Sequence, residues 1–126
     1  MQEALNPPVS LRKKDIVARY IRLLDQHISE LKAGTTDHVM EIRDFAALLH
    51  VHPGHLSNTI KEITGQSTCD LFEERLVKVA KELLLDPSRT ISQVAQQLTY
   101  DPSNFTKFFK HFTGQTPKAW RNTYSG

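Results

Sequence analysis

The chain has almost no cysteine, because Cys69 is the only one in 126 residues. A single cysteine excludes an internal disulfide framework and fits a reducing compartment, so we expect a cytoplasmic protein. Long apolar runs are also missing, and no stretch approaches the roughly 18 residues that a membrane-spanning helix needs. The N-terminal stretch from Met1 to Lys14 lacks the apolar core of a signal peptide. These absences predict a protein that does not bind a membrane.

Catalytic motifs are missing as well. The sequence contains no phosphate-binding glycine loop, no paired-carboxylate motif and no nucleophile–base pair, which argues against an enzyme and against a bound cofactor. One cluster, His50, His52 and His55, has the chemistry to bind a metal. His50 and His52 straddle a predicted helix-to-turn junction, however, and no cysteine or carboxylate completes a tetrahedral set nearby. We therefore expect no metal site. A small metal-dependent enzyme is kept as a third hypothesis, which elemental analysis would test.

A strong charge of one sign is lacking too, since the formal net charge is only +2. Nucleic-acid binding depends on whether basic side chains cluster on one face, and this number leaves that open. The hydrophobic share of 39% and the charged share of 24% are ordinary for a globular chain. A length of 126 residues predicts one domain, or two very small lobes that share a core.

The most informative feature that is present is an internal duplication. The segment from Ile42 to Ser67 aligns without a gap with the segment from Ile91 to Thr116, 49 residues further on, and eight of the 26 aligned pairs are identical. Each copy reads as a short helix, a tight turn before a proline, and a second helix that ends at Thr-Gly. Two short helices joined by such a turn form the helix-turn-helix pattern. The duplication predicts two similar helices placed against one long repetitive surface, for which DNA is the obvious candidate.

Hydrophobic periodicity predicts an all-α fold of about seven helices. The duplication divides it into two helix-turn-helix lobes joined by a long linker helix, and a lobe of this kind is expected to be homeodomain-like. Asp101 is predicted to cap the second helix of the second copy, with Pro102 at its first position. The linker helix, at about 1.5 Å per residue, is long enough to separate the lobes by roughly one turn of DNA. The expected segments are a disordered leader or linker at 1–10, a long first helix at 11–34, the first helix-turn-helix at 35–67, the linker helix at 68–86, and the second helix-turn-helix with a C-terminal helix at 87–126.

The second helix of each copy has an apolar face and a polar face. The apolar residues step by three and four, so we expect them to point inward. They are Leu56, Ile60 and Ile63 in the first copy, and Phe105, Phe108, Phe109 and Phe112 in the second. Phe72 and Trp120 are also assigned to the core. The opposite faces hold small, polar or cationic residues of the types that reach base edges and phosphates. They are Gly54, His55, Ser57, Asn58 and Lys61, and Ser103, Asn104, Thr106, Lys107 and Lys110.

These residues, in this order, resemble the AraC/XylS family of bacterial transcription regulators. The resemblance begins with Val51-His52-Pro53-Gly54-His55-Leu56-Ser57-Asn58, which is similar to the family's first helix-turn-helix. It continues through Glu74-Arg75-Leu76, which resembles the linker helix, to Phe108-Phe109-Lys110, Thr113-Gly114 and Trp120-Arg121 in the second motif. It covers about Asp37 to Asn122. The resemblance implies two recognition helices in successive major-groove segments on one face of the duplex.

Carried over residue by residue, the resemblance implies specific contacts with DNA. The implied base-facing residues are Gly54, Ser57, Asn58, Ser103, Asn104, Thr106 and Lys107. We add His55, because it lies on the same helix face, and we expect it to lie next to a phosphate or a base. Lys61 and Lys110 match lysines near the ends of the recognition helices and are better placed for phosphates. The chain departs from the family pattern in four places. Many members carry Arg at the positions of Asn58 and Lys107, Gly is common where Thr99 stands, and Tyr is usual at Trp120.

The leading hypothesis is therefore a sequence-specific DNA-binding transcription regulator, or the DNA-binding domain of one. RNA polymerase and an upstream sensory domain absent from this chain are the further partners that the resemblance implies. The alternative is a helical protein-interaction module that keeps the fold without DNA binding. The two hypotheses differ in salt dependence, because phosphate contacts make DNA affinity fall steeply with salt.

Overall fold

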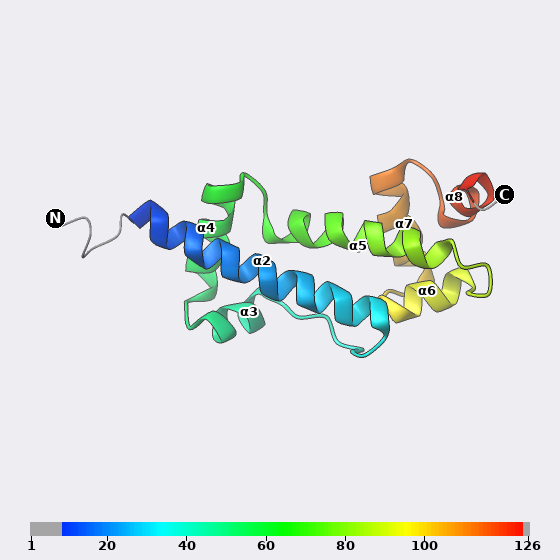
Figure 1. The fold of residues 1–126 in the computed structure, drawn as a ribbon. Helices are drawn as coiled ribbons and strands as arrows, with labels where there is room; N and C mark the ends of the chain where they lie inside the picture. Colours follow the sequence, from blue (N-terminus) through cyan, green and yellow to red (C-terminus); the bar gives the residue numbers. More distant parts are fainter. Residues whose placement is uncertain (1–8, 125–126) are drawn as a thin grey trace. The chain divides into compact units, whose positions relative to one another are not determined.

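The computed structural model describes residues 9–124. This part of the chain forms seven helices and no strand (Figure 1), which confirms the predicted all-α fold. The helices are α2 (Val9–Ala33), α3 (Ile42–Leu49), α4 (Pro53–Thr64), α5 (Thr68–Leu84), α6 (Ile91–Gln97), α7 (Pro102–Thr113) and α8 (Pro117–Tyr124). Within the described range, no helix combines the length and the apolarity that crossing a membrane requires.

The chain divides into two compact units. The first comprises residues up to His27 together with Met40–Phe72, and the second comprises Ile28–Val39 together with the chain from Glu73 onward. Unit 1 therefore contains α3, α4 and most of α2, whereas unit 2 contains most of α5 and all of α6, α7 and α8. Each unit holds one copy of the duplicated segment.

Unit 1 has a core that is mainly aliphatic. Leu24, Leu56 and Ile60 are completely buried, and the ring of Tyr20 meets Phe45 edge to face with ring centroids 5.1 Å apart. Burial of such side chains stabilises the fold by about 1.5–3 kcal/mol each. This core joins α2 to both helices of the first motif.

A buried histidine also ties the two parts of unit 1 together. His27 is only 2% exposed, and its Nε2 accepts a hydrogen bond of 3.0 Å from the backbone N–H of Met40. The histidine ring also meets Phe45 edge to face, with centroids 6.1 Å apart. The bond satisfies a polar atom of a buried side chain. The end of α2 in this unit is thereby linked to the segment that leads into α3.

Unit 2 adds a cluster of aromatic rings to an otherwise aliphatic core. Phe105 and Phe109 are completely buried, with ring centroids 5.9 Å apart, and Phe109 meets Trp120 of α8 edge to face at 5.7 Å. Val94 and Leu84 close this core from α6 and α5. Aromatic pairs at such distances contribute about 0.5–1.5 kcal/mol beyond the area they bury. The core therefore holds α7 firmly against α6 and α8.

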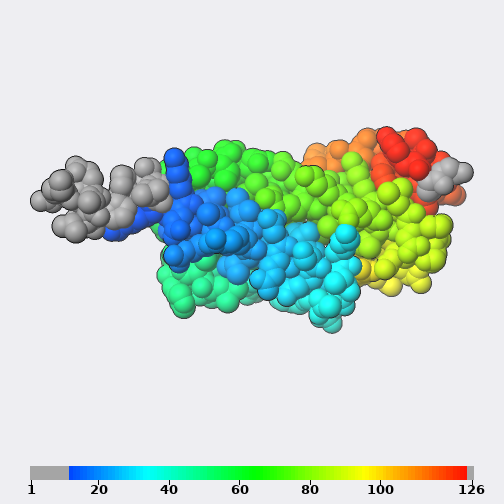
Figure 2. Space-filling view, in the orientation of Figure 1, coloured from blue at the N-terminus to red at the C-terminus, as the bar shows by residue number. Residues whose placement is uncertain are grey.

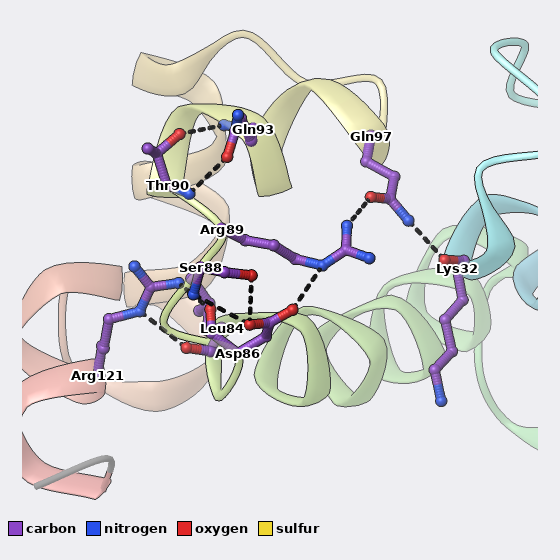
Figure 3. A network of polar contacts seen from close by, with 9 residues as sticks. All are labelled: Lys32, Leu84, Asp86, Ser88, Arg89, Thr90, Gln93, Gln97 and Arg121. Carbon is purple, nitrogen blue, oxygen red and sulfur yellow. Dashed lines mark hydrogen bonds and ion pairs between the residues drawn. The ribbon is translucent and has the colours of Figure 1, made fainter.

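An arginine of α8 binds the end of α5. The Nε of Arg121 donates to the backbone carbonyl of Leu84 at 2.8 Å, and its Nη2 donates to the carbonyl of Asp86 at 3.4 Å (Figure 3). The last carbonyls of a helix have no partner within the helix, and they carry partial negative charge that a cation stabilises. Arg121 thus fixes the C-terminal helix to the end of α5.

A second polar network positions α6 (Figure 3). One carboxylate oxygen of Asp86 accepts from the backbone N–H and the hydroxyl of Ser88, and the other accepts from the Nε of Arg89 at 3.3 Å. Arg89 also donates to the Gln97 side chain, whose amide nitrogen in turn donates to the carbonyl of Lys32. The hydrogen bonds from Ser88, aided by Arg89, hold the pKa of Asp86 below its usual value. Gln97 thereby connects the end of α6 to the end of α2 within unit 2.

The helix ends differ from the expected boundaries by a residue or two. Helix α2 begins at Val9, whereas the leader was expected to reach residue 10, and the rest of that leader lies outside the described residues. The expected stop at Gly34 is present, with a φ of 72° that favours glycine. Three side chains assigned to the core are only half-buried: Ile63, Phe72 and Phe112. Ile63 and Phe112 lie in the last turn of their helices.

Candidate nucleic-acid interface

The turn inside each motif uses the same left-handed backbone position. His50 ends α3 with a φ of 57°, and Thr99, its counterpart 49 residues later, has a φ of 69°. The next residue in each copy, Val51 or Tyr100, donates its backbone N–H five residues back, at 3.0 and 2.9 Å. This reversal directs each chain into the proline that opens the second helix. It also explains why glycine suits the position of Thr99, since a β-branched residue is strained at positive φ.

The second helix of each motif begins with a side-chain cap. In the second copy, the Asp101 carboxylate accepts from the N–H of Asn104 at 2.9 Å, which confirms the predicted cap. In the first copy, Nδ1 of His52 accepts from the N–H of Gly54 at 3.0 Å. Sequence reasoning missed this cap because histidine is not among the preferred capping residues. The signal was available in the alignment, which pairs His52 with Asp101.

A glycine makes room for the histidine cap. A Cβ placed on Gly54 would lie 3.2 Å from Nδ1 of His52, which is tighter than nine in ten real Cβ contacts. A side chain at this position would require the imidazole to shift by a few tenths of an ångström from its present capping position. Glycine at position 54 therefore leaves the cap undisturbed.

The second helix of each motif also ends in the same way. Gly65 and Gly114 take left-handed φ values of 76° and 78°, and their N–H groups donate to the carbonyls of Lys61 and Lys110 at 2.9 and 2.8 Å. This is the αL type of helix end, for which glycine is preferred because it has no Cβ. The length of α4 and α7 is thus set by residues that are identical in the two copies.

The inner faces of these helices pack into their own units. Leu56, Thr59 and Ile60 are buried in α4, and Phe105, Phe108 and Phe109 are buried in α7. Thr59 was not expected there, because a threonine by itself gives no hydrophobic signal. The signal lay in the alignment, which pairs Thr59 with the inward-pointing Phe108. The other residues that were predicted to point inward, Ile63 and Phe112, are half-buried. The opposite face of each helix is consequently left available.

The outer face of α4 carries the predicted residues of the first motif. Gly54, His55 and Asn58 are exposed and Ser57 is half-buried. They lie in the first half of α4, beginning at the helix N-terminus. The backbone N–H groups there carry partial positive charge, which favours phosphate or another anion nearby.

The outer face of α7 carries more functional groups. Ser103, Asn104 and Lys107 are exposed, and Thr106 is half-buried. The amide of Asn104 donates to the Asp101 carboxylate at 2.6 Å, and the hydroxyl of Thr106 donates to the carbonyl of Pro102 at 3.0 Å. Asn104 would have to break its hydrogen bond with Asp101 before both groups of its amide could contact a base. Among the described residues, the Lys107 ammonium has no such hydrogen bond.

Comparison with known proteins agrees with this geometry. Residues 45–123 match a family model described as a helix-turn-helix domain, which is more than half of the chain. The chain belongs to the AraC-type helix-turn-helix family. This family consists of DNA-binding domains of transcription regulators and is not typically enzymatic. Double-stranded DNA is the partner that the family indicates.

Individual relatives share the same region. An uncharacterized HTH-type transcriptional regulator from Bacillus subtilis, YobQ, is 29% identical over 113 residues, covering 86% of this chain and 47% of the relative. The C-terminal domain of AraT, a response regulator from Geobacillus stearothermophilus, superposes with a TM-score of 0.74 at 28% identity, covering 86% of this chain and 84% of that one. The DNA-binding domain of AdpA in complex with a target DNA has the same fold, with a TM-score of 0.70 at 17% identity over 84% of this chain and 92% of that one. The chain spans about half, or less, of the length of the curated relatives it matches.

Two lysines lie near the C-terminal ends of the second helices. Lys61 and Lys110 are exposed in the last turns of α4 and α7. The ammonium of Lys61 donates to the carbonyl of Gly65 at 3.3 Å, a contact at the surface that a phosphate could replace. A lysine on a flexible stem suits a phosphate, which needs a charge and little fixed geometry.

Proposed function

We propose that this AraC-type domain reads a specific DNA sequence through two recognition helices, α4 and α7, as the DNA-binding part of a bacterial transcription regulator. The observation that carries the proposal is the repeated frame: in both copies the second helix has a buried inner face and an exposed polar outer face. Helix-turn-helix proteins place the outer face of this second helix in the major groove. Two such helices would read two successive groove segments.

Within this proposal the outer-face residues have distinct tasks. Asn58, Asn104 and Lys107 carry the donors and acceptors that distinguish bases in the major groove, with Ser57, Ser103 and Thr106 as more permissive contacts. Gly54 permits a close approach of the helix N-terminus, and His55 lies beside it as a base or phosphate neighbour. Lys61 and Lys110 bind phosphates and set the register of the helices on the duplex. Asn58 and Lys107 replace the arginines of many relatives, so the base preference is this chain's own.

The partners of the whole protein extend this proposal. RNA polymerase is the partner through which a bound regulator would act, and a sensory domain is the segment that would control it. The support is that the matched relatives are longer than this chain. A bacterial regulator of this kind works in the cytoplasm, where its DNA is.

The decisive experiment is selection of bound sites from a random pool of duplexes, followed by affinity measurements on the selected site at several salt concentrations. We expect one preferred sequence, and a loss of about 0.9 log unit in affinity per phosphate contact for each log unit of salt. Lys61→Ala and Lys110→Ala should each weaken all sequences about equally and lower the salt slope by about one. Absent or salt-independent binding would instead favour a protein-interaction module with this fold.

A second experiment tests whether both helices read DNA together. Inserting two residues into the middle of α5 rotates everything beyond the insertion by about 200° and shifts it by about 3 Å. Specific affinity should then fall to the non-specific level, whereas a four-residue insertion, at about 400°, should restore part of it. Circular dichroism checks that both variants fold. If the folded two-residue variant bound as the parent does, only one helix would contact DNA.

A further inference from the structure

A shallow hollow with an apolar floor lies in unit 1, between α2 and α3. Its volume is about 370 Å³, and it is lined by Leu23, Leu48 and Leu49 together with Arg19 and Arg22. The part of α2 drawn in blue and the α3 segment (blue-green) lie side by side in the space-filling view (Figure 2), and the α2 residues that line the hollow come from the middle of that helix. This volume is at the lower end of the range, about 300–1,000 Å³, that binding pockets occupy.

Leu48 is the most unusual residue of this hollow. Its side chain is 56% exposed, and among the described side chains Leu85 (48%) and Tyr124 (63%) are the other large hydrophobic residues that are exposed. Its neighbours Leu23 and Leu49 are half-buried, so the three leucines form one continuous apolar surface. An exposed apolar surface that is rimmed by polar groups is typical of an interaction site.

The duplication supplies an internal comparison. Gln97 occupies the position in the second copy that Leu48 occupies in the first. Gln97 is half-buried, and its side chain accepts from Arg89 and donates to the carbonyl of Lys32 (Figure 3). The second copy therefore uses this position to connect its own helices through hydrogen bonds. The first copy places a leucine there that forms no such connection and remains exposed.

The charges at the rim restrict what could cover the leucines. Among the residues that the structure describes, the charged residues that line the hollow are two arginines, and no acidic residue lines it. Arg19 forms an ion pair of 3.1 Å with Asp15, but both side chains are more than half exposed, so this pair is weak and easily exchanged. A guanidinium presents a planar fork of donors that matches a carboxylate. The chemistry that fits is aliphatic at the centre and acidic at the edge.

We propose that this hollow, which we call the Leu48 site, docks an acidic amphipathic helix of a partner protein. An apolar side chain of that helix packs on Leu48 and Leu23, and its glutamates or aspartates pair with Arg19 and Arg22. Binding of an amphipathic helix in a shallow groove is a common mode of protein recognition. None of the predicted DNA-reading residues lines the site.

The test uses the full chain and a fluorescein-labelled helical peptide that carries leucines at positions i and i+4 flanked by glutamates. Fluorescence anisotropy measures its affinity. We expect saturable binding, lost when lysines replace the glutamates of the peptide. Leu48→Gln, which installs the residue of the second copy, should weaken binding about tenfold, equivalent to about 1.4 kcal/mol. Leu85→Gln is the matched control, because Leu85 is also exposed (48%) but lies outside the site, and it should leave the affinity unchanged.

A charge exchange separates docking from a general loss of structure. Arg22→Glu should bind the glutamate peptide about tenfold more weakly and gain affinity for the lysine peptide, which no folding defect would produce. Equal binding of both peptides to the parent, or equal losses in Leu48→Gln and Leu85→Gln, would overturn the proposal. So would a fall in DNA affinity on Arg22→Glu, which would assign the surface to DNA. A parent dimer that Leu48→Gln converts to a monomer in sedimentation would assign it to a second copy of this chain.

Discussion

The two helix-turn-helix copies share a backbone frame and differ in what they build on it. Both have a left-handed residue in the turn, a capped helix that opens with proline, and a helix that ends at glycine. Some of the identical residues fix this backbone, such as Pro53 and Pro102 or Gly65 and Gly114. The caps, most of the outer-face residues and the buried face of the second helix have diverged. The difference shows that the frame tolerates either aliphatic or aromatic side chains on that buried face, and that each copy can carry its own surface chemistry.

The outer faces suggest an unequal division of labour. The first copy offers Gly54, which has no side chain, and the neutral amide of Asn58. The second offers Asn104 and the charged Lys107 at a packed aromatic helix. Hydrogen bonds from charged donors are stronger than those between neutral groups. We therefore expect the second copy to supply more of the sequence discrimination.

The largest effect on stability is expected from removing a ring of the aromatic cluster in unit 2. Phe105→Ala should lower the free energy of unfolding by about 3–5 kcal/mol, because it leaves a cavity and removes ring contacts. Leu56→Ala, at the aligned position of the first copy, should cost about 2–5 kcal/mol. Urea unfolding followed by the fluorescence of Trp120, which packs in unit 2, reports the first change, and circular dichroism reports both. A Phe105→Ala variant with the parent's urea midpoint would show that this core does not stabilise the unit.

The next effect compares the two outer faces. Lys107→Ala should cost about 1–3 kcal/mol on the selected site and relax base preference at one position. Asn58→Ala should have the same kind of effect but a smaller one, because it removes a neutral group. Site selection repeated with each variant measures both. If Asn58→Ala relaxed the preference more than Lys107→Ala did, the first copy would be the stronger reader.

The caps give a smaller contrast. Asp101→Ala should lower the free energy of unfolding by about 1 kcal/mol. His52→Ala should cost less, since histidine lacks the negative charge that interacts favourably with a helix N-terminus. His52→Asp, which copies the second motif, should raise stability by about 0.3–1 kcal/mol. Thermal unfolding at neutral pH gives all three values. Equal losses at the two positions would mean that the charge of the cap contributes nothing here.

The turn positions offer a stabilising change. Thr99→Gly should raise the free energy of unfolding by about 0.5–1 kcal/mol. Glycine removes the strain of a β-branched residue at positive φ, and the greater chain entropy that glycine loses on folding offsets only part of this gain. His50→Gly should gain less, since histidine is among the residues enriched in that region. Thr99→Ala is the control, because it removes the β-branching but keeps a Cβ at positive φ. If Thr99→Ala stabilised as much as glycine does, the strain would arise from branching alone.

The smallest effect concerns pH. The pKa of Asp86 is lowered from 3.8 by its hydrogen bonds with Ser88 and by Arg89, so the ionised carboxylate is favoured in the folded state. Its contribution to stability is therefore present above that unfolded value and is lost as pH falls through the lower folded value. Asp86→Asn should be slightly less stable than the parent at neutral pH, and the difference should shrink in acid. Melting curves across this range measure it, and a difference that grows in acid would contradict the assignment.

Much of the fold followed from local signals. The proline and glycine pairs at the helix ends, the Asp101 cap and the three- and four-residue periodicity predicted the helices to within a residue or two. These features act within one turn of the chain, so the sequence contains nearly all the information that determines them. The residues of the candidate site could also be selected from the sequence, because side chains opposite the apolar face of a helix are left exposed.

Other features needed the folded chain. The sequence by itself determined that there are two similar motifs, where their helices begin and end, and which outer-face residues are candidates for DNA contact. Only the tertiary structure decided that Ile63 and Phe112 are half-buried, and that Gln97 forms hydrogen bonds while Leu48 is exposed. The reason is physical: helix formation and capping depend on neighbours along the chain, whereas burial and hydrogen-bond partners depend on elements that are far away in sequence and meet only after folding.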